Sequence, residues 1–274
     1  MAYRYDEKLI VSSRHVERYF YLDKYVWVNF KRRERKPKDK GKPQVCKSKF
    51  SISRTRNDIK RLVNSNPQLS TFLTLTYNQE ILDVKSSYPI FMKFIQRMSY
   101  KFPDWAYVAV VEFQPISKRV HYHVVCNYQL PVFESKYYKK KMERWFANRY
   151  WKNGFVNFKP THDVENLGVY LCKYLSKDAH DQRLYGKKKF FCSRNLQKPT
   201  TLTGYEAYKF IQKNNLEQTT PKYKTRFNNE YLGRVDYSAY VLDFIPPLPK
   251  KPTPFDKTIL RLKMFGLIPP NYEQ

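Results

Sequence analysis

The sequence predicts an α+β protein in which an antiparallel sheet carries helices on one of its faces. Between residues 71 and 178, segments rich in β-branched and aromatic residues alternate with segments of helical periodicity. Two strong strand segments, 105–114 and 119–128, are separated only by the turn PISK, so they should pair as an antiparallel hairpin. Such an order of strands and helices is typical of an α+β domain.

The other elements follow in chain order. Partial alternation of aromatic and apolar positions predicts a short strand or hairpin within residues 1–30. Asp163 is a suitable residue to cap the helix that follows it. The remaining expected elements are helix 53–64, strand 71–77, helix 87–101, helix 134–151, strand 155–159, helix 163–178, a helix in GYEAYKFIQ and a short terminal helix at 255–265.

The charge of the chain points to a polyanionic partner. There are 52 Lys and Arg residues against 24 Asp and Glu residues, which gives a formal net charge of +28. Phosphate backbones attract such a surface, and the release of their counterions drives binding. The aromatic content of 17% favours nucleic acid, because rings stack on unpaired bases. Composition alone leaves a ribosomal-type RNA binder and a membrane-surface protein open.

Cysteine usage and hydropathy indicate a cytoplasmic protein. The four cysteines are far apart and form no CxxC pair, which argues against a zinc ribbon and against a disulfide framework. The first residues lack an apolar signal core, and no run of about 18 apolar residues is present for a membrane span. We therefore expect a reducing, intracellular compartment.

A pair of histidines on one strand is the first candidate site. Successive strand side chains point to opposite faces, so His121 and His123 share a face while Tyr122 points away. Two imidazoles in this arrangement can bind one metal ion. Because the chain has only five histidines, a chance occurrence of this pattern stays an alternative.

Glu112 strengthens the interpretation as a metal site. It is a lone carboxylate in the apolar strand YVAVVEFQ, and a buried carboxylate needs a partner. The short hairpin turn brings it beside His121. A Glu-His-His set with open positions suits Mg²⁺ or Mn²⁺ in phosphate chemistry. The alternative is a salt bridge from Glu112 to Lys118 or Arg119.

The helix that contains YLCKYLSK offers a nucleophile. Tyr170 and Tyr174 are four residues apart and share a face, and so do Lys173 and Lys177. A tyrosine hydroxyl, with an ordinary pKa of about 10, becomes nucleophilic when a nearby cation or metal stabilises its phenolate. The alternative is an aromatic core stripe with solvated lysines.

These motifs resemble the HUH endonuclease superfamily, specifically the rolling-circle replication initiators of small phages, plasmids and single-stranded DNA viruses. FLTLTY at 72–77 resembles the first motif, HYHVV at 121–125 the metal motif and KYLSKD at 173–178 the tyrosine motif. SRNLQKP at 193–199 resembles a segment that follows the nuclease core in phage and plasmid members. The resemblance covers residues 53–200, although the turn PISKR replaces the Arg-Gly turn of many relatives.

The resemblance implies an HUH fold with a ferredoxin-like or RRM-like central sheet. It also implies nicking of single-stranded DNA at a replication origin, a covalent 5′-phosphotyrosine, a free 3′-hydroxyl that primes synthesis, and later rejoining of the strand. Glu112 occupies the position of the third metal ligand in eukaryotic-virus members. The metal would be Mg²⁺ or Mn²⁺, held by His121, His123 and Glu112.

The resemblance also assigns roles to the tyrosine helix and to DNA-contacting residues. Tyr174 with Lys177 fits the single-tyrosine form, and Tyr170 with Lys173 would supply the second nucleophile of the two-tyrosine form. The first motif is associated with DNA recognition. The expected DNA contacts are Thr74, Thr76, Arg54, Arg56, Lys118 and Arg119.

No GxxxxGK[ST] segment is present, so no phosphate-loop helicase is fused to the nuclease. A host helicase and a host DNA polymerase are therefore expected partners, in the cytoplasm of a bacterial host. We expect a basic N-terminal extension at 1–50, the HUH endonuclease domain at 51–215 and a Pro-containing C-terminal extension at 216–274. Alternatives are a relaxase or transposase of the same superfamily, and a non-enzymatic single-strand binding protein.

Overall fold

The computed structural model confirms an α+β protein with two antiparallel five-stranded sheets. Contacts divide the chain into two compact units. We call Asp39–Lys198 the central unit, and Met1–Lys38 together with Pro199–Gln274 the flanking unit. The structure describes residues 3–23, 26–28, 49–161, 163–177, 182–184 and 188–249.

The central unit is built on an antiparallel sheet of strand order β8-β5-β7-β6-β9. The hairpin expected from the sequence is confirmed, because β6 pairs with β7 in a register that sets Glu112 opposite His121. In chain order its elements are α1 (Lys49–Asn64), β5 (Thr71–Tyr77), α2 (Val84–Lys101), β6 (Tyr107–Phe113), β7 (Val120–Cys126), α3 (Lys136–Phe146), the π-helix η1 (Ala147–Trp151), β8 (Gly154–Pro160), α4 (Leu167–Lys177), the 3-10 helix η2 (Gln182–Leu184) and β9 (Phe190–Cys192).

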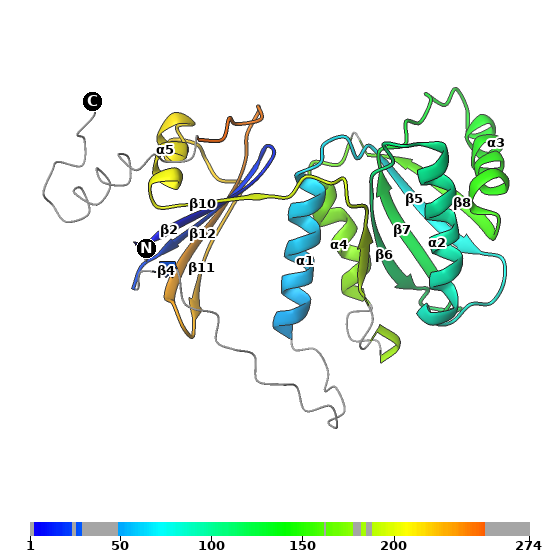
Figure 1. The fold of residues 1–274 in the computed structure, drawn as a ribbon, viewed down its shortest axis with the longest axis horizontal. Helices are drawn as coiled ribbons and strands as arrows, with labels where there is room; N and C mark the ends of the chain where they lie inside the picture. Colours follow the sequence, from blue (N-terminus) through cyan, green and yellow to red (C-terminus); the bar gives the residue numbers. More distant parts are fainter. Residues whose placement is uncertain are drawn as a thin grey trace, which may run out of the picture. The chain divides into compact units, whose positions relative to one another are not determined.

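Helices cover both faces of this sheet, so the expectation of helices on one face only was wrong. Figure 1 shows α2 and α3 on one side of β5, β6 and β7, and α1 and α4 on the other. The physical reason is that every residue of β6 and β7 is buried. Strands that are apolar on both faces need cover on both, as in sheets enclosed between helix layers.

The face under α2 is the larger core, which we call the α2 face. Phe91 of α2 stacks on Tyr122 of β7 with ring centroids 4.1 Å apart. The Tyr122 hydroxyl also lies 3.0 Å from the Ser87 hydroxyl, so its one polar atom is satisfied inside the core. Asp83 caps the start of α2 by accepting a hydrogen bond from the Ser86 amide at 3.0 Å.

The opposite face of the sheet is covered by α1 and α4, and we call it the α4 face. Ile59 and Val63 of α1 and Leu171 and Leu175 of α4 pack there against Val110 and its neighbours. The two helices approach each other closely at Gly168, whose amide donates to the Asn64 side chain at 3.2 Å. A Cβ at Gly168 would lie 2.5 Å from the Lys60 carbonyl oxygen, so this approach requires glycine.

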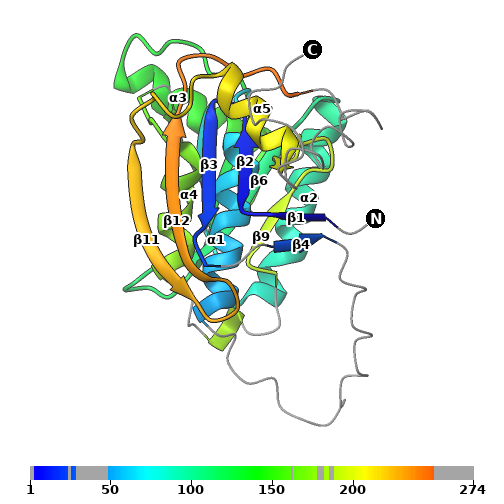
Figure 2. The ribbon, with the colours of Figure 1, turned by 90° about the vertical axis from the view of Figure 1, so that its left-hand side faces the viewer.

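The flanking unit has its own antiparallel sheet, of strand order β10-β2-β3-β12-β11. Figure 2 shows four of these strands side by side. Helix α5 packs Phe210 and Ile211 against Leu9 and Val16 of the sheet. The elements are β1 (Tyr3–Tyr5), β2 (Glu7–Ser12), β3 (His15–Tyr21), β4 (Val26–Val28), β10 (Thr200–Thr203), α5 (Tyr205–Lys213), β11 (Tyr223–Asn229) and β12 (Gly233–Val241).

The flanking sheet joins segments from both ends of the chain. β2 and β3 form the hairpin expected within residues 1–30, and β3 pairs with β12. Neither β11 nor β12 was expected from the sequence, because β11 is largely exposed and its residues lack an apolar alternation. The contact-based units thus divide the chain differently from the expected ranges 1–50, 51–215 and 216–274, which stay a prediction about function. The basic segment 31–43 and the terminal helix at 255–265 fall outside the described residues.

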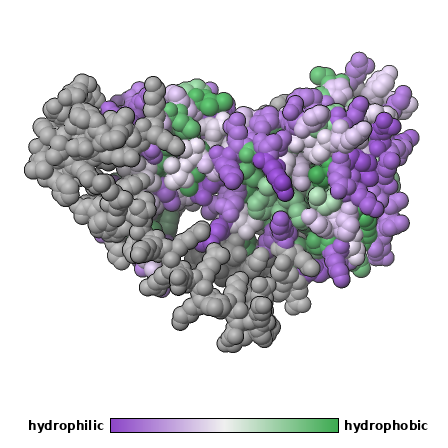
Figure 3. Space-filling view, in the orientation of Figure 1, coloured by the Kyte–Doolittle hydropathy of each residue, from purple (hydrophilic) through white to green (hydrophobic). Residues whose placement is uncertain are grey.

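The surface is strongly hydrophilic around α3. On the face shown in Figure 3, hydrophilic residues gather at the end of the central unit where α3 lies. This helix carries the sequence KYYKKKMERWF, with most of its lysines exposed. Among the described residues, no helix combines the length and apolarity that a membrane crossing requires.

Candidate active site

The predicted metal ligands lie together on the α4 face. Glu112 of β6 is directly opposite His121 of β7, and His123 is two residues further along the same strand. Because strand side chains alternate between faces, all three share the α4 face, whereas Tyr122 points into the α2 face. The three are buried, with exposed fractions of 7% for Glu112, 6% for His121 and 4% for His123.

Two of these groups are already hydrogen-bonded to each other. His123 Nε2 lies 2.5 Å from Glu112 Oε2, and His123 Nδ1 lies 3.2 Å from the Thr74 hydroxyl. His121 differs, because its Nε2 is buried and has no hydrogen-bond partner. Burial, followed by the proximity of His123, lowers the pKa of His121 and favours the neutral imidazole that a metal binds.

The donor set has the chemistry of a divalent-metal site. An unsatisfied imidazole nitrogen in a buried position is costly, and a metal ion is one group that would satisfy it. Within the described part of the chain, however, no three His, Cys, Asp or Glu side chains are already arranged around a common point. The Glu112–His123 hydrogen bond accounts for this, since each occupies the other's lone pair or proton.

Helix α4 places both tyrosines over this site. The Tyr174 ring lies against the His123 ring, with centroids 3.8 Å apart. Phe72 of β5 contacts both tyrosine rings, with centroid distances of 5.2 Å to Tyr170 and 5.4 Å to Tyr174. The two tyrosine hydroxyls lie 3.0 Å apart. The spacing of four residues on α4 therefore produces one pair of adjacent hydroxyls beside the histidines.

Lys159 of β8 completes the cluster, and sequence reasoning missed it. Its Nζ donates a hydrogen bond to the Tyr170 hydroxyl at 3.1 Å and lies 4.7 Å from the centre of that ring. The register of β8 and β5 sets Lys159 opposite Phe72, which in turn contacts both tyrosines. The one signal in the sequence was the alternation of FVNFK, which puts Lys159 on the same face as Phe155.

The electrostatic environment separates the two tyrosines. Burial raises the pKa of Tyr170, but hydrogen bonds from Tyr174 and Lys159, together with the charges of Lys159 and Lys173, outweigh burial and lower the pKa below that of an ordinary tyrosine. Burial, then the hydrogen bond to Tyr170, raises the pKa of Tyr174. In this arrangement Tyr170 is the hydroxyl that ionises more readily.

The other predicted residues are distributed around this cluster. Thr74 and Thr76 are half-buried on β5, opposite His123 and His121 respectively. Lys173 Nζ lies 5.6 Å from the Tyr170 ring centre, and Lys177 is the last residue of α4, with its side chain outside the described part.

The basic DNA-contact candidates lie on α1 and in the β6–β7 turn. Arg54 and Arg56 are exposed on α1. In the turn, Lys118 is exposed and has a positive φ of 57°, and Arg119 is half-buried. The carboxylate of Glu112, for which Lys118 and Arg119 were alternative partners, is hydrogen-bonded to His123. DNA contacts by these basic residues stay a prediction.

Comparison with known proteins adds a family to this geometry. Residues 70–179 match a family model described as replication-associated protein ORF2. The matched segment runs from the start of β5 to the end of α4, so it contains all three motifs and every residue of the cluster. The match confirms the predicted resemblance over this segment and is consistent with a rolling-circle replication initiator. No curated protein and no solved structure gave a match.

Proposed function

We propose that the protein is a metal-dependent endonuclease that starts rolling-circle DNA replication by attaching a tyrosine to the 5′ end that it cuts. The match to a replication-associated family supports a role in DNA replication. The observation that carries the chemistry is the placement of two adjacent tyrosine hydroxyls beside the buried His-Glu cluster. A core stripe of tyrosines would not need an ammonium group directed at one hydroxyl, as Lys159 is at Tyr170.

The metal would be held by His121, His123 and Glu112. The unpartnered His121 Nε2 supports this set, and binding would replace the Glu112–His123 hydrogen bond. When bound, Mg²⁺ or Mn²⁺ would polarise the scissile phosphate and offset charge that develops on it. Thr74, which lies beside His123 Nδ1, would keep that ring oriented through the exchange.

The tyrosine then acts as the nucleophile. Loss of its hydroxyl proton to solvent leaves a phenolate, which Lys159 stabilises through its charge and hydrogen bond. The phenolate oxygen forms a bond to phosphorus while the bond from phosphorus to the 3′-oxygen breaks. The leaving 3′-oxygen takes a proton from water and becomes the hydroxyl that a host polymerase extends. Attack by a 3′-hydroxyl on the phosphotyrosine reverses these bond changes and rejoins the strand.

The two tyrosines can share this task. Sequence reasoning placed Tyr174 first, because Lys177 and an acidic residue follow it. The hydrogen bonds and charges around Tyr170 favour that residue as the first phenolate. Tyr174, 3.0 Å away, would then accept the strand in a second transfer. Duplex unwinding is left to a host helicase.

A nicking assay tests this function. The protein is incubated with Mn²⁺ and single-stranded DNA from the candidate origin of its own replicon, and a denaturing gel detects DNA that becomes attached to protein. Mass spectrometry of the peptide–DNA adduct identifies the attached residue. We expect an adduct on Tyr170 or Tyr174, and we expect none in the double variant Tyr170→Phe with Tyr174→Phe.

The matched control is Tyr100→Phe, which changes a highly exposed tyrosine on α2 and should leave the adduct unchanged. An adduct that survives the double variant would overturn the assignment of the nucleophile. Tight DNA binding with no cleavage of any substrate, and no effect of His121→Ala, would overturn the nuclease and leave a single-strand binding protein.

A further inference from the structure

Strand β8 presents a row of exposed side chains that continues the α4 face. Its alternation buries Val156 and Phe158 and exposes Phe155, Asn157 and Lys159. In the register with β5, Phe155 is opposite Thr76 and Lys159 is opposite Phe72. One end of this row is therefore the lysine that contacts Tyr170, and the other end is an aromatic ring.

Phe155 lies in line with the candidate metal ligands. Register places Phe155, Thr76, His121 and Glu112 opposite one another on four consecutive strands. Neighbouring strands are about 4.8 Å apart, so the backbones of Phe155 and His121 are about 10 Å apart. The Phe155 side chain is 69% exposed, and Thr76 between them is only half-buried. A polymer bound at the histidines could thus extend across Thr76 to this ring.

The backbone that carries Phe155 is held in place. Gly154 has a φ of 141°, and a Cβ there would lie 2.3 Å from the Thr76 carbonyl oxygen, so only glycine allows β8 to start this close to β5. The Trp151 indole donates to the same carbonyl oxygen at 2.9 Å. The Asn78 amide donates to the Asn153 carbonyl at 2.9 Å. The exposed ring is therefore fixed on a hydrogen-bonded turn.

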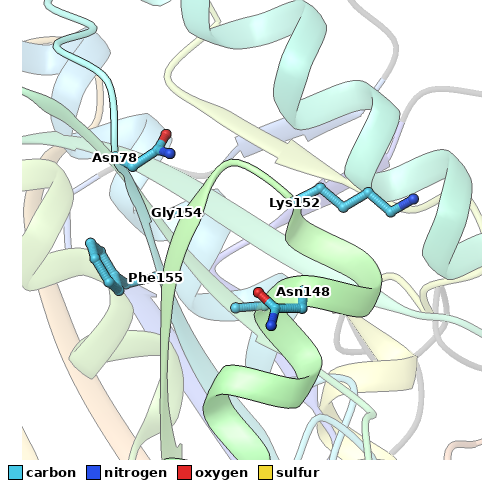
Figure 4. A pocket seen from close by; sticks show the side chains of 6 residues that line it. Asn78, Asn148, Lys152, Gly154 and Phe155 are labelled. Atoms are coloured by element: carbon cyan, nitrogen blue, oxygen red, sulfur yellow. The ribbon is translucent and has the colours of Figure 1, made fainter.

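An open cavity of about 480 Å³ adjoins this turn, and its lining is mostly polar. Asn78, Asn148 and Lys152 contribute two amides and one ammonium group, while Phe155 contributes the ring. Figure 4 shows Asn148 and Lys152 on one side of the start of β8 and the Phe155 ring on the other. Amides offer hydrogen-bond donors and acceptors to a base edge, and an ammonium group can pair with a phosphate.

We propose that Phe155 and this cavity form a subsite for single-stranded DNA, in which Phe155 stacks on an unpaired base and Lys152 contacts the phosphate backbone. The proposal rests on the proposed function for one point, that the stacked base belongs to a nucleotide close to the phosphate that is cut. Stacking on an exposed aromatic ring is tolerant of sequence, because every base has a π face. The net charge of +28 supports the same class of ligand.

The test separates base stacking from phosphate contact. Binding of the full chain, without divalent metal, is measured by fluorescence anisotropy with labelled oligothymidine and with an abasic strand of equal length. We expect Phe155→Ala to weaken binding of oligothymidine about tenfold, within the range for one stacked base. Binding of the abasic strand should not change. Phe155→Trp should retain binding, and Phe155→Leu should weaken it although the residue stays apolar.

Salt dependence supplies a second readout. Phe155→Ala should leave the slope of log affinity against log salt concentration unchanged, whereas Lys152→Gln should reduce that slope by about one phosphate contact. Tyr100→Ala, which removes an exposed ring on α2, should alter neither quantity. Equal affinity of Phe155→Ala and the wild type for oligothymidine would overturn the subsite, and so would an equal loss for the abasic strand.

This experiment can fail independently of the proposed function, because it requires neither metal nor cleavage. A protein that nicks its origin but shows no base-dependent loss in Phe155→Ala refutes the subsite alone. A protein that shows this loss but forms no covalent adduct refutes the nuclease alone.

Discussion

The two faces of the central sheet are built from the same strands but differ in how their polar groups are satisfied. On β7, Tyr122 packs against Phe91 and other rings with its hydroxyl hydrogen-bonded, so this side is a fully satisfied core. On the same strand, His121 is buried with an unpartnered nitrogen. The α2 face therefore supplies stability, and the α4 face leaves buried polar groups that a ligand can use. A one-residue alternation separates folding from chemistry.

The largest expected effect lies on the α2 face. Tyr122→Ala should lower the free energy of unfolding of the central unit by about 3–5 kcal/mol, as is usual when a buried aromatic side chain is removed. Trp105 and Trp151 belong to the same core cluster, so tryptophan fluorescence during urea unfolding reports this loss. A loss below about 1 kcal/mol would show that the α2 face does not carry the stability.

The sequence predicted most of this asymmetry, and its limits have physical causes. The gathering of Glu112, His121 and His123 follows from strand alternation and a short hairpin, both of which are local. The contact between Lys159 and Tyr170 joins β8 to α4, and no local pattern specifies how a helix crosses a sheet. The cover on both faces was also missed, because a strand that is buried on both sides gives no alternation to read.

The flanking unit shows the same limit. Its sheet pairs β3 with β12, which are more than 200 residues apart in the chain. The apolar residues of β2 made a strand predictable, whereas the polar, exposed β11 did not differ from a loop in composition. Long-range pairing of this kind depends on the whole fold, so the boundaries expected from composition did not match the contact-based units.

The second prediction concerns the neighbour of Tyr122 on the α4 face. His121→Ala should reduce the nicking rate by at least about 100-fold, because loss of even an outer partner of a metal ligand costs 10–100-fold. It should also remove the stabilisation of the wild type by Mn²⁺ in a thermal melt, a readout that does not depend on activity. Its matched control is Tyr122→Phe, which keeps the ring on the other face and should retain nicking. Full activity of His121→Ala would show that the unpartnered nitrogen holds no metal.

A smaller effect should sharpen the roles within the α4 face. Lys159→Gln removes the ammonium group beside Tyr170, so the pKa of Tyr170 should rise. The nicking rate increases with pH as the phenolate forms, and the profile should therefore move to higher pH. A shift of about one unit would lower the rate about tenfold at neutral pH.

The controls for this shift use charge and position. Lys159→Arg keeps a cation at the hydroxyl and should restore most of the profile, whereas Lys141→Gln on α3 should leave it in place. An unchanged profile in Lys159→Gln would show that Tyr170 is not the first phenolate and would return that role to Tyr174.

The smallest expected effect tests how the α2 face is anchored. Asp83→Ala removes the cap of α2 and should lower the free energy of unfolding by about 1 kcal/mol at neutral pH. The hydrogen bond from Ser86 lowers the pKa of Asp83, so this stabilisation is present above the ordinary carboxyl pKa and is lost as the pH falls through the lowered value. The difference between wild type and Asp83→Ala in urea unfolding should therefore shrink at about pH 3. Asp83→Asn keeps an acceptor without the charge, so it should retain most of the cap and show no such dependence. An equal difference at both pH values would mean that the carboxylate does not act through its charge, and α2 would then be held on the sheet by Phe91 and its apolar neighbours alone.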